Sequence, residues 1–89
     1  MSESSANLKE EIKRAIVRSL RLPMAPDDIA DDIALFGEGL GLDSIDVLEL
    51  VLEIERTFGV AIADEQTGAR VLRNVNSIAD YVTAARNPT

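Results

Sequence analysis

Apolar residues recur at helical spacing in the first quarter of the chain. Four aliphatic residues follow one another at steps of four and share one face of a helix: Leu8, Ile12, Ile16 and Leu20. Asn7 precedes this row, and Glu10 lies three residues after Asn7. This spacing is typical of a capping box at a helix start. The pattern predicts a helix over residues 8–21.

The next segment, residues 22–42, has no regular period. Helix breakers interrupt it at Pro23, Pro26, Gly37, Gly39 and Gly41. Apolar residues are scattered between them at Ile29, Ile33, Leu35, Phe36 and Leu40. We therefore expect a long loop that is pinned to the core. The pairs Asp27-Asp28 and Asp31-Asp32 would suit a helical turn or a weak cation site, but such carboxylates are ordinarily solvated, so we assign no metal.

A second helix is predicted to begin at Asp43 or Ser44 and to end near Phe58, because Gly59 tolerates the left-handed conformation that closes helices. Its core-facing stripe recurs at steps of three and four: Val47, Leu50, Val51, Ile54 and Phe58. A short, mobile helical segment over residues 64–72 should follow, weakened by Gly68 in its interior.

The last helix is predicted to start with Ser77 as its cap and Asp80 three residues later. It should bury four side chains: Ile78, Tyr81, Val82 and Ala85. The fold class is therefore all-α, a small four-helix bundle with three main helices, one short helix and a long loop between the first two helices. One domain over residues 1–89 is expected, with flexible tails at 1–6 and 87–89.

Composition and charge exclude several classes of function. The chain of 89 residues has a net charge of −7 and no Lys or Arg between residues 22 and 55, so nucleic acid is a poor partner and basic protein surfaces are better ones. It has no histidine and no cysteine, which excludes ordinary Ser-His-Asp or Cys-His catalysis and thiolate metal sites. No apolar run could cross a bilayer and the N-terminus does not resemble a secretory signal. We expect a non-catalytic, monomeric, cytoplasmic protein that does not bind membranes.

The second helix carries a further apolar row, Ile45, Leu48 and Leu52, beside a row of carboxylates, Asp46, Glu49 and Glu53. Periodicity alone does not decide whether the apolar row packs against the long loop or is presented to a partner. Like charges at this spacing destabilise a helix slightly, so local helix stability does not explain them, whereas binding a basic partner would.

Ser44 lies where Asp43 can cap the helix and Asp46 can complete the box, so its hydroxyl is not needed by the first turn. A phosphoryl group there would lie at the positive end of the helix dipole among unpaired backbone amides. A serine in a first helical turn is by itself ordinary.

The neighbours of this serine supply the specificity. The run Leu40-Gly41-Leu42-Asp43-Ser44-Ile45-Asp46, followed by Leu48-Glu49-Leu50, resembles the phosphopantetheine attachment motif of acyl carrier proteins. The resemblance continues through residues 52–55, 58–60, 62, 64–65 and 77–82. It implies that Ser44 receives 4′-phosphopantetheine from coenzyme A through a phosphopantetheinyl transferase, and that the thiol of the arm carries acyl intermediates as thioesters. The reactive group then arrives with the cofactor.

The same resemblance implies delivery to fatty-acid or related lipid or polyketide biosynthetic enzymes, such as acyl transferases and ketoacyl synthases with basic docking patches. The positions matching the family's recognition helix are Asp43, Ile45, Asp46, Leu48, Glu49, Leu52 and Glu53. Encounters through such a surface should be weak and sensitive to salt.

Two features depart from the common fatty-acid carriers. The stretch between Ile62 and Tyr81 is about two residues longer, and arginines stand at Arg56, Arg70 and Arg73 where those carriers are more acidic. We therefore expect a specialised bacterial carrier. Two alternatives stay open: an aminoacyl or peptidyl carrier with the same serine, and an unmodified acidic helical adaptor that occupies a groove on a basic partner. A serine hydrolase is set aside, because the chain offers no base.

Overall fold

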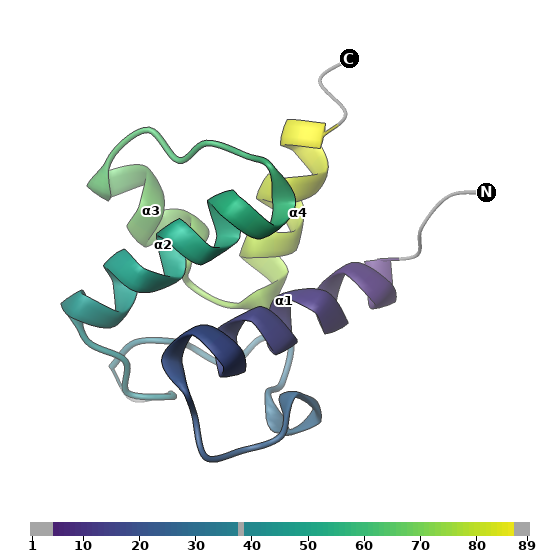
Figure 1. Cartoon of the computed structure of the whole chain (residues 1–89), viewed down its shortest axis with the longest axis vertical. Coiled ribbons are helices and arrows are strands. Elements are labelled where there is room, and N and C mark those ends of the chain that lie inside the picture. The colour runs from purple at the N-terminus through teal and green to yellow at the C-terminus, as the bar shows by residue number, and fades with distance from the viewer. Residues whose placement is uncertain (1–4, 38, 87–89) are drawn as a thin grey trace.

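The chain folds into helices joined by one long and several short connections. A computed structural model describes residues 5–37 and 39–86. The elements are α1 (Ser5–Leu20), a 3-10 turn η1 (Pro26–Asp28), α2 (Ser44–Phe58), α3 (Glu65–Val71) and α4 (Val75–Arg86). Within the described ranges no strand forms, and the β-type pairing is a single bridge between Phe36 and Leu42. The predicted all-α fold is confirmed (Figure 1).

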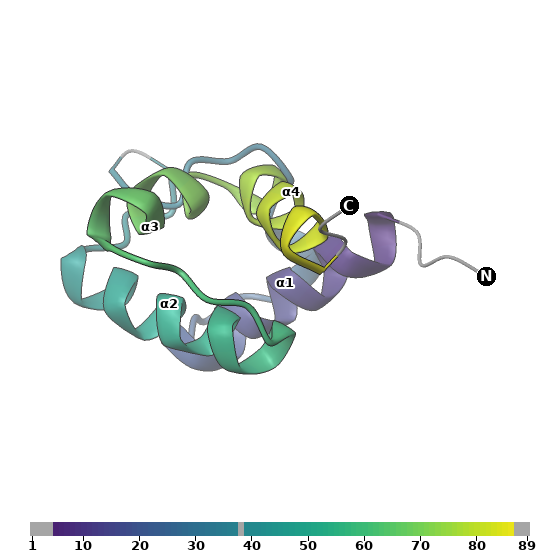
Figure 2. The same cartoon turned by 90° about the horizontal axis from the view of Figure 1, so that it is seen from above.

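The helices surround one apolar core. α1 packs on α2 and on α4, while the short α3 closes the side between α2 and α4. Figure 2 shows this ring of four helices from above. Side chains from every helix fill its centre, among them Ile12, Ile16, Leu50, Ile54, Val71, Ile78 and Val82. The core stripe predicted for the second helix is confirmed, with Leu50, Ile54 and Phe58 buried and Val47 and Val51 half-buried against the core.

The first helix starts earlier than its pattern predicts. α1 begins at Ser5, so Asn7 lies inside the helix, and the predicted cap at Asn7 with Glu10 is wrong. Glu10 instead forms an i,i+4 ion pair with Arg14 at 3.6 Å. Residues 5 and 6 therefore belong to α1 and not to a tail, while residues 1–4 and 87–89 lie outside the described residues. At its other end the helix closes at Leu20, because Arg21 has a left-handed φ of 53°.

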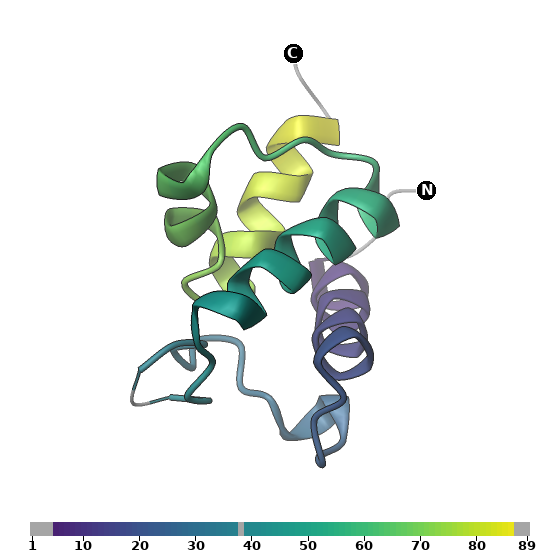
Figure 3. The same ribbon diagram turned by 60° about the vertical axis from the view of Figure 1, so that its left-hand side comes forward.

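The long segment between α1 and α2 is pinned to the core, as predicted. Ile29 and Leu35 are fully buried. The backbone N–H of Leu35 donates to the carbonyl of Arg73 at 3.0 Å, and the N–H of Asn76 donates to the carbonyl of Asp31 at 3.1 Å. Figure 3 shows the segment crossing one end of the bundle. These bonds tie the loop to the junction of α3 and α4, far away in sequence.

One residue of each acidic pair in this loop has a structural role. Asp28 accepts a hydrogen bond from the backbone N–H of Ala25 in the 3-10 turn, at 3.3 Å. Asp31 lies 2.7 Å from the ammonium group of Lys13 and 3.8 Å from that of Lys9. The hydrogen bond from Lys13 lowers the pKa of Asp31. Among the described residues, no three acidic side chains gather as a metal site would require.

The short helix α3 lies within one residue of its predicted bounds at each end, whereas α4 begins two residues before its predicted cap. The carboxylate of Asp64 caps α3 by accepting from the N–H of Thr67 at 2.7 Å, and this hydrogen bond lowers the pKa of Asp64. α4 begins at Val75, so the predicted Ser77 cap is wrong. The side chain of Asn74 accepts from the Ser77 N–H at 2.8 Å, and the Ser77 hydroxyl donates to the Val71 carbonyl at 2.6 Å.

The buried face of α4 differs from the prediction at three positions. Ile78 and Val82 are buried and Tyr81 is half-buried, as expected. Ala85 is exposed, whereas Val75 and Ala79 are buried in addition to the predicted residues. The Tyr81 hydroxyl donates to the carbonyl of Ala61, which ties α4 to the connection between α2 and α3.

Candidate modification site and docking face

The start of α2 is built by two aspartates. The carboxylate of Asp43 accepts from the backbone N–H groups of Ile45 and Asp46, each at 3.1 Å. Asp46 returns the interaction, accepting from the N–H of Asp43 at 3.0 Å. This reciprocal capping box is the one the sequence predicts, and Gly59, with a φ of 67°, closes the other end as predicted.

Ser44 is the first residue of this helix and its side chain is exposed. Because Asp43 and Asp46 satisfy the cap, the Ser44 hydroxyl has no hydrogen-bond partner among the described residues. An accessible hydroxyl on a rigid helix start can be presented to an enzyme without local unfolding. The site therefore suits covalent modification from outside, and it requires no pocket.

The backbone amides around Ser44 are not the free anion cradle that the sequence suggests. Asp43 already occupies the N–H groups of Ile45 and Asp46, and its carbonyl accepts from the N–H of Val47 at 3.0 Å. The expectation of unpaired amides is wrong at these three positions. A phosphodiester on Ser44 would be favoured by the helix dipole and opposed by the two neighbouring carboxylates. We therefore expect it to extend into solvent.

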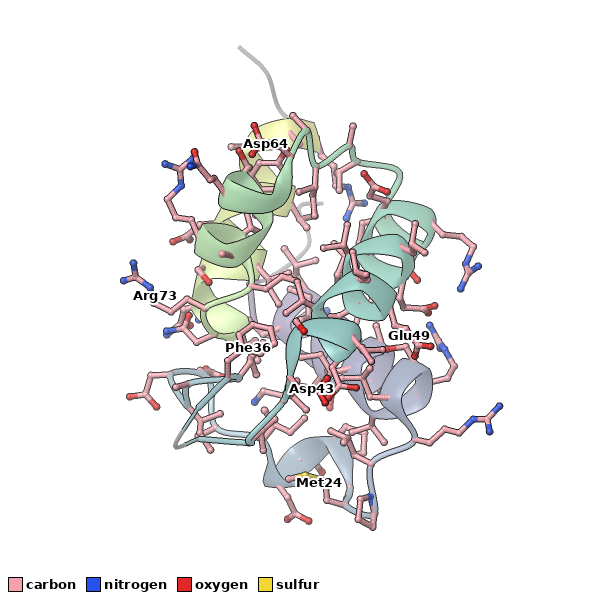
Figure 4. The ribbon with its side chains drawn as sticks, turned by 90° about the vertical axis from the view of Figure 1, so that its left-hand side faces the viewer. Met24, Phe36, Asp43, Glu49, Asp64 and Arg73 are labelled. Carbon is pink, nitrogen blue, oxygen red and sulfur yellow. The ribbon has the colours of Figure 1, made fainter. Side chains whose placement is uncertain are left out.

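The loop before Ser44 fixes where the helix begins. Leu42 is buried, and its N–H donates to the Leu35 carbonyl at 3.1 Å. Gly41 has a left-handed φ of 75°, which lets the chain turn into this contact. The serine is thus held two residues from a buried anchor. Figure 4 shows Asp43 where the loop meets the start of α2, with Glu49 farther along that helix.

The outer face of α2 is apolar and open. Ile45, Leu48 and Leu52 are 67%, 59% and 61% exposed, and they are the large hydrophobic side chains of the described residues that stand out to solvent. Packing of this row against the long loop, the alternative that periodicity leaves open, does not occur. Exposing three large aliphatic side chains in one row is unfavourable in water unless a partner covers them.

The carboxylates beside this row do not form one continuous charged edge. Asp43 and Glu49 are exposed, and Asp46 is half-buried within the capping box. Glu53 is only 6% exposed, so the expectation that it belongs to the exposed recognition row is wrong. The local roles of Asp46 and Glu53 also correct the expectation that helix stability does not explain the acidic row.

Glu53 is held between two arginines. Its two carboxylate oxygens lie 2.6 Å from Nη2 of Arg18 on α1 and 2.6 Å from Nη2 of Arg56 on α2. The Thr57 hydroxyl donates to the same carboxylate at 3.1 Å. These hydrogen bonds, the one from Arg18 foremost, lower the pKa of Glu53 to about 2. The spacing of Glu53 to Arg56 and Thr57 along one helix could have suggested part of this cluster, but Arg18 comes from another helix.

Comparisons with known proteins agree with the motif around Ser44. A family model described as "Phosphopantetheine attachment site" matches residues 10–82. The chain is also similar to a protein named acyl carrier protein from Sulfurovum sp. (strain NBC37-1). The two are 39% identical over 62 residues, which cover 70% of this chain and 79% of that protein. Within the described ranges, no helix has the length and apolar character needed to cross a bilayer.

Proposed function

Since the chain belongs to the phosphopantetheine-attachment family, whose members carry a covalent 4′-phosphopantetheine, we propose that it is an acyl carrier protein modified on Ser44. One observation carries the choice of residue: Ser44 presents an exposed hydroxyl with no partner among the described residues, at a helix start that Asp43 and Asp46 hold without it. The arm would supply the thiol that bears the acyl group, since the chain has no cysteine.

Ser44 supplies the nucleophile for loading. Its oxygen forms the new bond to the phosphorus next to the pantetheine of coenzyme A, and the bond to the adenosine-bearing phosphate breaks as 3′,5′-adenosine bisphosphate leaves with the electron pair. In this proposal the hydroxyl proton goes to a base of the transferase, because the carboxylates of Asp43 and Asp46 beside Ser44 are engaged in the capping box. Asp43 and Asp46 fix the backbone that carries the oxygen. In this proposal the chain itself is not catalytic.

The exposed row Ile45, Leu48 and Leu52, with Asp43 and Glu49 beside it, is the surface we propose for partner enzymes with basic docking patches. Apolar burial would supply affinity, and the carboxylates would steer the encounter. The monomeric, cytoplasmic state and the delivery to fatty-acid or related biosynthetic enzymes stay predictions from the sequence.

Intact-protein mass spectrometry tests the proposal. The purified chain is incubated with coenzyme A, Mg²⁺ and a broad-specificity phosphopantetheinyl transferase, beside Ser44→Ala and the control Ser19→Ala. We expect a gain of one phosphopantetheine in the wild type and in Ser19→Ala, and none in Ser44→Ala. A gain in Ser44→Ala would show that the site is wrong. No gain in folded wild type with several transferases would favour the unmodified adaptor.

A further inference from the structure

A pair of arginines stands at the end of the docking face farthest from Ser44. Arg18 and Arg56 come from different helices, yet both bind the carboxylate of Glu53. Their side chains are 62% and 76% exposed, whereas that of Glu53 is 7% exposed. Two cations share one anion, so the cluster of Arg18, Glu53 and Arg56 carries excess positive charge on guanidinium groups that solvent or a partner can reach.

Glu53 keeps the two guanidinium groups in place. An exposed arginine on its own samples many rotamers, and ordering it on binding costs conformational free energy. Here each group already bonds to a buried, ionised carboxylate, and Thr57 holds the same carboxylate from a third side. The arginines are therefore preorganised, a property that surface arginines generally lack.

The cationic pair is continuous with the apolar row. An open hollow of about 280 Å³ between α1 and α2 is lined by Ser19, Glu49, Leu52, Glu53 and Arg56. Leu52, the last residue of the exposed row, thus borders the same hollow as Arg56. Asp46 and Arg56 are ten residues apart on one helix, which corresponds to about 15 Å along its axis. The charge along α2 therefore changes sign: Asp43 is acidic near Ser44, Glu49 borders the hollow, and Arg56 lies seven residues beyond Glu49.

We propose that Arg18 and Arg56 are specificity determinants of this docking face, which select partner enzymes that place a carboxylate side chain opposite them. This inference rests on the proposed carrier function. A partner with positive charge opposite Asp43 and Glu49 and negative charge opposite the arginine pair matches the face in one direction along α2 only. A partner whose patch is basic throughout meets like charge at Arg56, which is unfavourable and slows association.

The test measures loading of Ser44 by a phosphopantetheinyl transferase whose docking patch is uniformly basic. The triple variant Arg18→Gln/Glu53→Gln/Arg56→Gln removes the pair without leaving a buried carboxylate unpartnered. Arg73→Gln is the matched control, because it makes the same net change in charge on an exposed arginine outside the face. We expect kcat/KM at low salt to rise about threefold or more in the triple variant and to change less than about 1.5-fold in the control. The gain should disappear near ~0.5 M salt.

A charge-swap arm tests the predicted partner chemistry directly. One rim lysine of the transferase that faces Arg56 in the docked complex is changed to glutamate. We expect this enzyme to load the wild type faster than the triple variant, the reverse of the order seen with the unmodified enzyme. Circular dichroism checks that each variant is folded, and Arg56→Gln, which keeps the Arg18–Glu53 pair, replaces the triple variant if that one unfolds.

The outcomes separate the inference from the proposed function. Equal rates for the triple variant and Arg73→Gln, or no reversal with the charge-swapped enzyme, would overturn the role of the arginines while leaving the carrier function intact. Absence of loading in every folded form, including the wild type with several transferases, would overturn the carrier function and this inference together.

Discussion

At the start of α2, Asp43 has the structural role and its neighbour Ser44 is the residue proposed for modification. Asp43 makes the hydrogen bonds that a helix start needs, and Ser44 makes none among the described residues. The residue proposed for modification is therefore separable from the residue that keeps the helix in place.

This division predicts different stabilities for two alanine variants. Asp43→Ala should lower the free energy of unfolding by about 1–2 kcal/mol, because it removes acceptors for two backbone N–H groups. Ser44→Ala should change it by less than about 0.5 kcal/mol. Urea unfolding followed by circular dichroism measures both. Equal losses would mean that the serine is structural.

Glu53 gives the fold a predictable pH dependence. Its pKa is about 2 in the folded protein against an ordinary value of 4.5, so the folded state favours the ionised form. The stabilisation is complete above the ordinary pKa and is lost as the pH falls from 4.5 towards 2. We expect a loss on the order of 1–3 kcal/mol from this group.

The measurement is urea unfolding of wild type and Glu53→Gln at several pH values across that window. Asp31 and Asp64 also have lowered pKa values and contribute acid sensitivity of their own, which both proteins share. The difference between the two proteins isolates Glu53. A constant difference down to pH ~2.5 would contradict the assigned ion-pair cluster.

Among the elements, α2 has two apolar faces, one buried in the core and one exposed to solvent. Leu50 and Ile54 are fully buried, whereas Leu48 and Leu52 remain exposed. The periodic pattern identifies both rows, but only the position of α1 and of the long loop leaves the second one open. The element that anchors the core is thus also the element offered to partners.

The short helix α3 carries a glycine that the fold does not require. Gly68 is buried, its φ is not in the left-handed region, and a Cβ atom added there would lie 3.5 Å from Cγ2 of Val51, an ordinary contact. Gly68→Ala should therefore raise the free energy of unfolding by about 0.5–1 kcal/mol, since alanine favours the helix. Thermal unfolding measures this. Destabilisation would mean that α3 cannot accept the methyl group against α2.

At the scale of the whole molecule, charge is arranged along the docking face. Glu49 is exposed on that face and forms no ion pair within the described part of the chain. Removing its charge should affect association with basic partners more than folding.

Glu49→Lys should lower kcat/KM for loading by a basic-patch transferase about threefold to tenfold at low salt, with little effect at high salt. Asp80→Lys, the same charge change on an exposed position of α4, is the control and should have a smaller effect. The free energy of unfolding of both variants should stay within about 0.5 kcal/mol of the wild-type value. Equal rates for the two variants would show that only net charge matters.

The features that the sequence predicts correctly depend on neighbours in the chain. The Asp43–Asp46 box and the Gly59 stop each involve residues within four positions, so their geometry follows from local spacing. The serine motif and the core row of α2 are local in the same sense. Errors at Asn7 and Ser77 arose because a plausible cap residue lay inside a helix that started earlier.

What only the tertiary structure decided depends on contacts between distant segments. The sequence determined an all-helical carrier with a serine at a capped helix start, because periodicity and capping act over a few residues. It could not determine that Glu53 is buried, because its partner Arg18 lies 35 residues away on another helix. Nor could it determine whether the long loop covers the second apolar row of α2, Ile45, Leu48 and Leu52. Burial depends on how the helices pack against one another. Packing buries Glu53, which was expected on the recognition surface, and there its carboxylate binds the exposed Arg18 and Arg56.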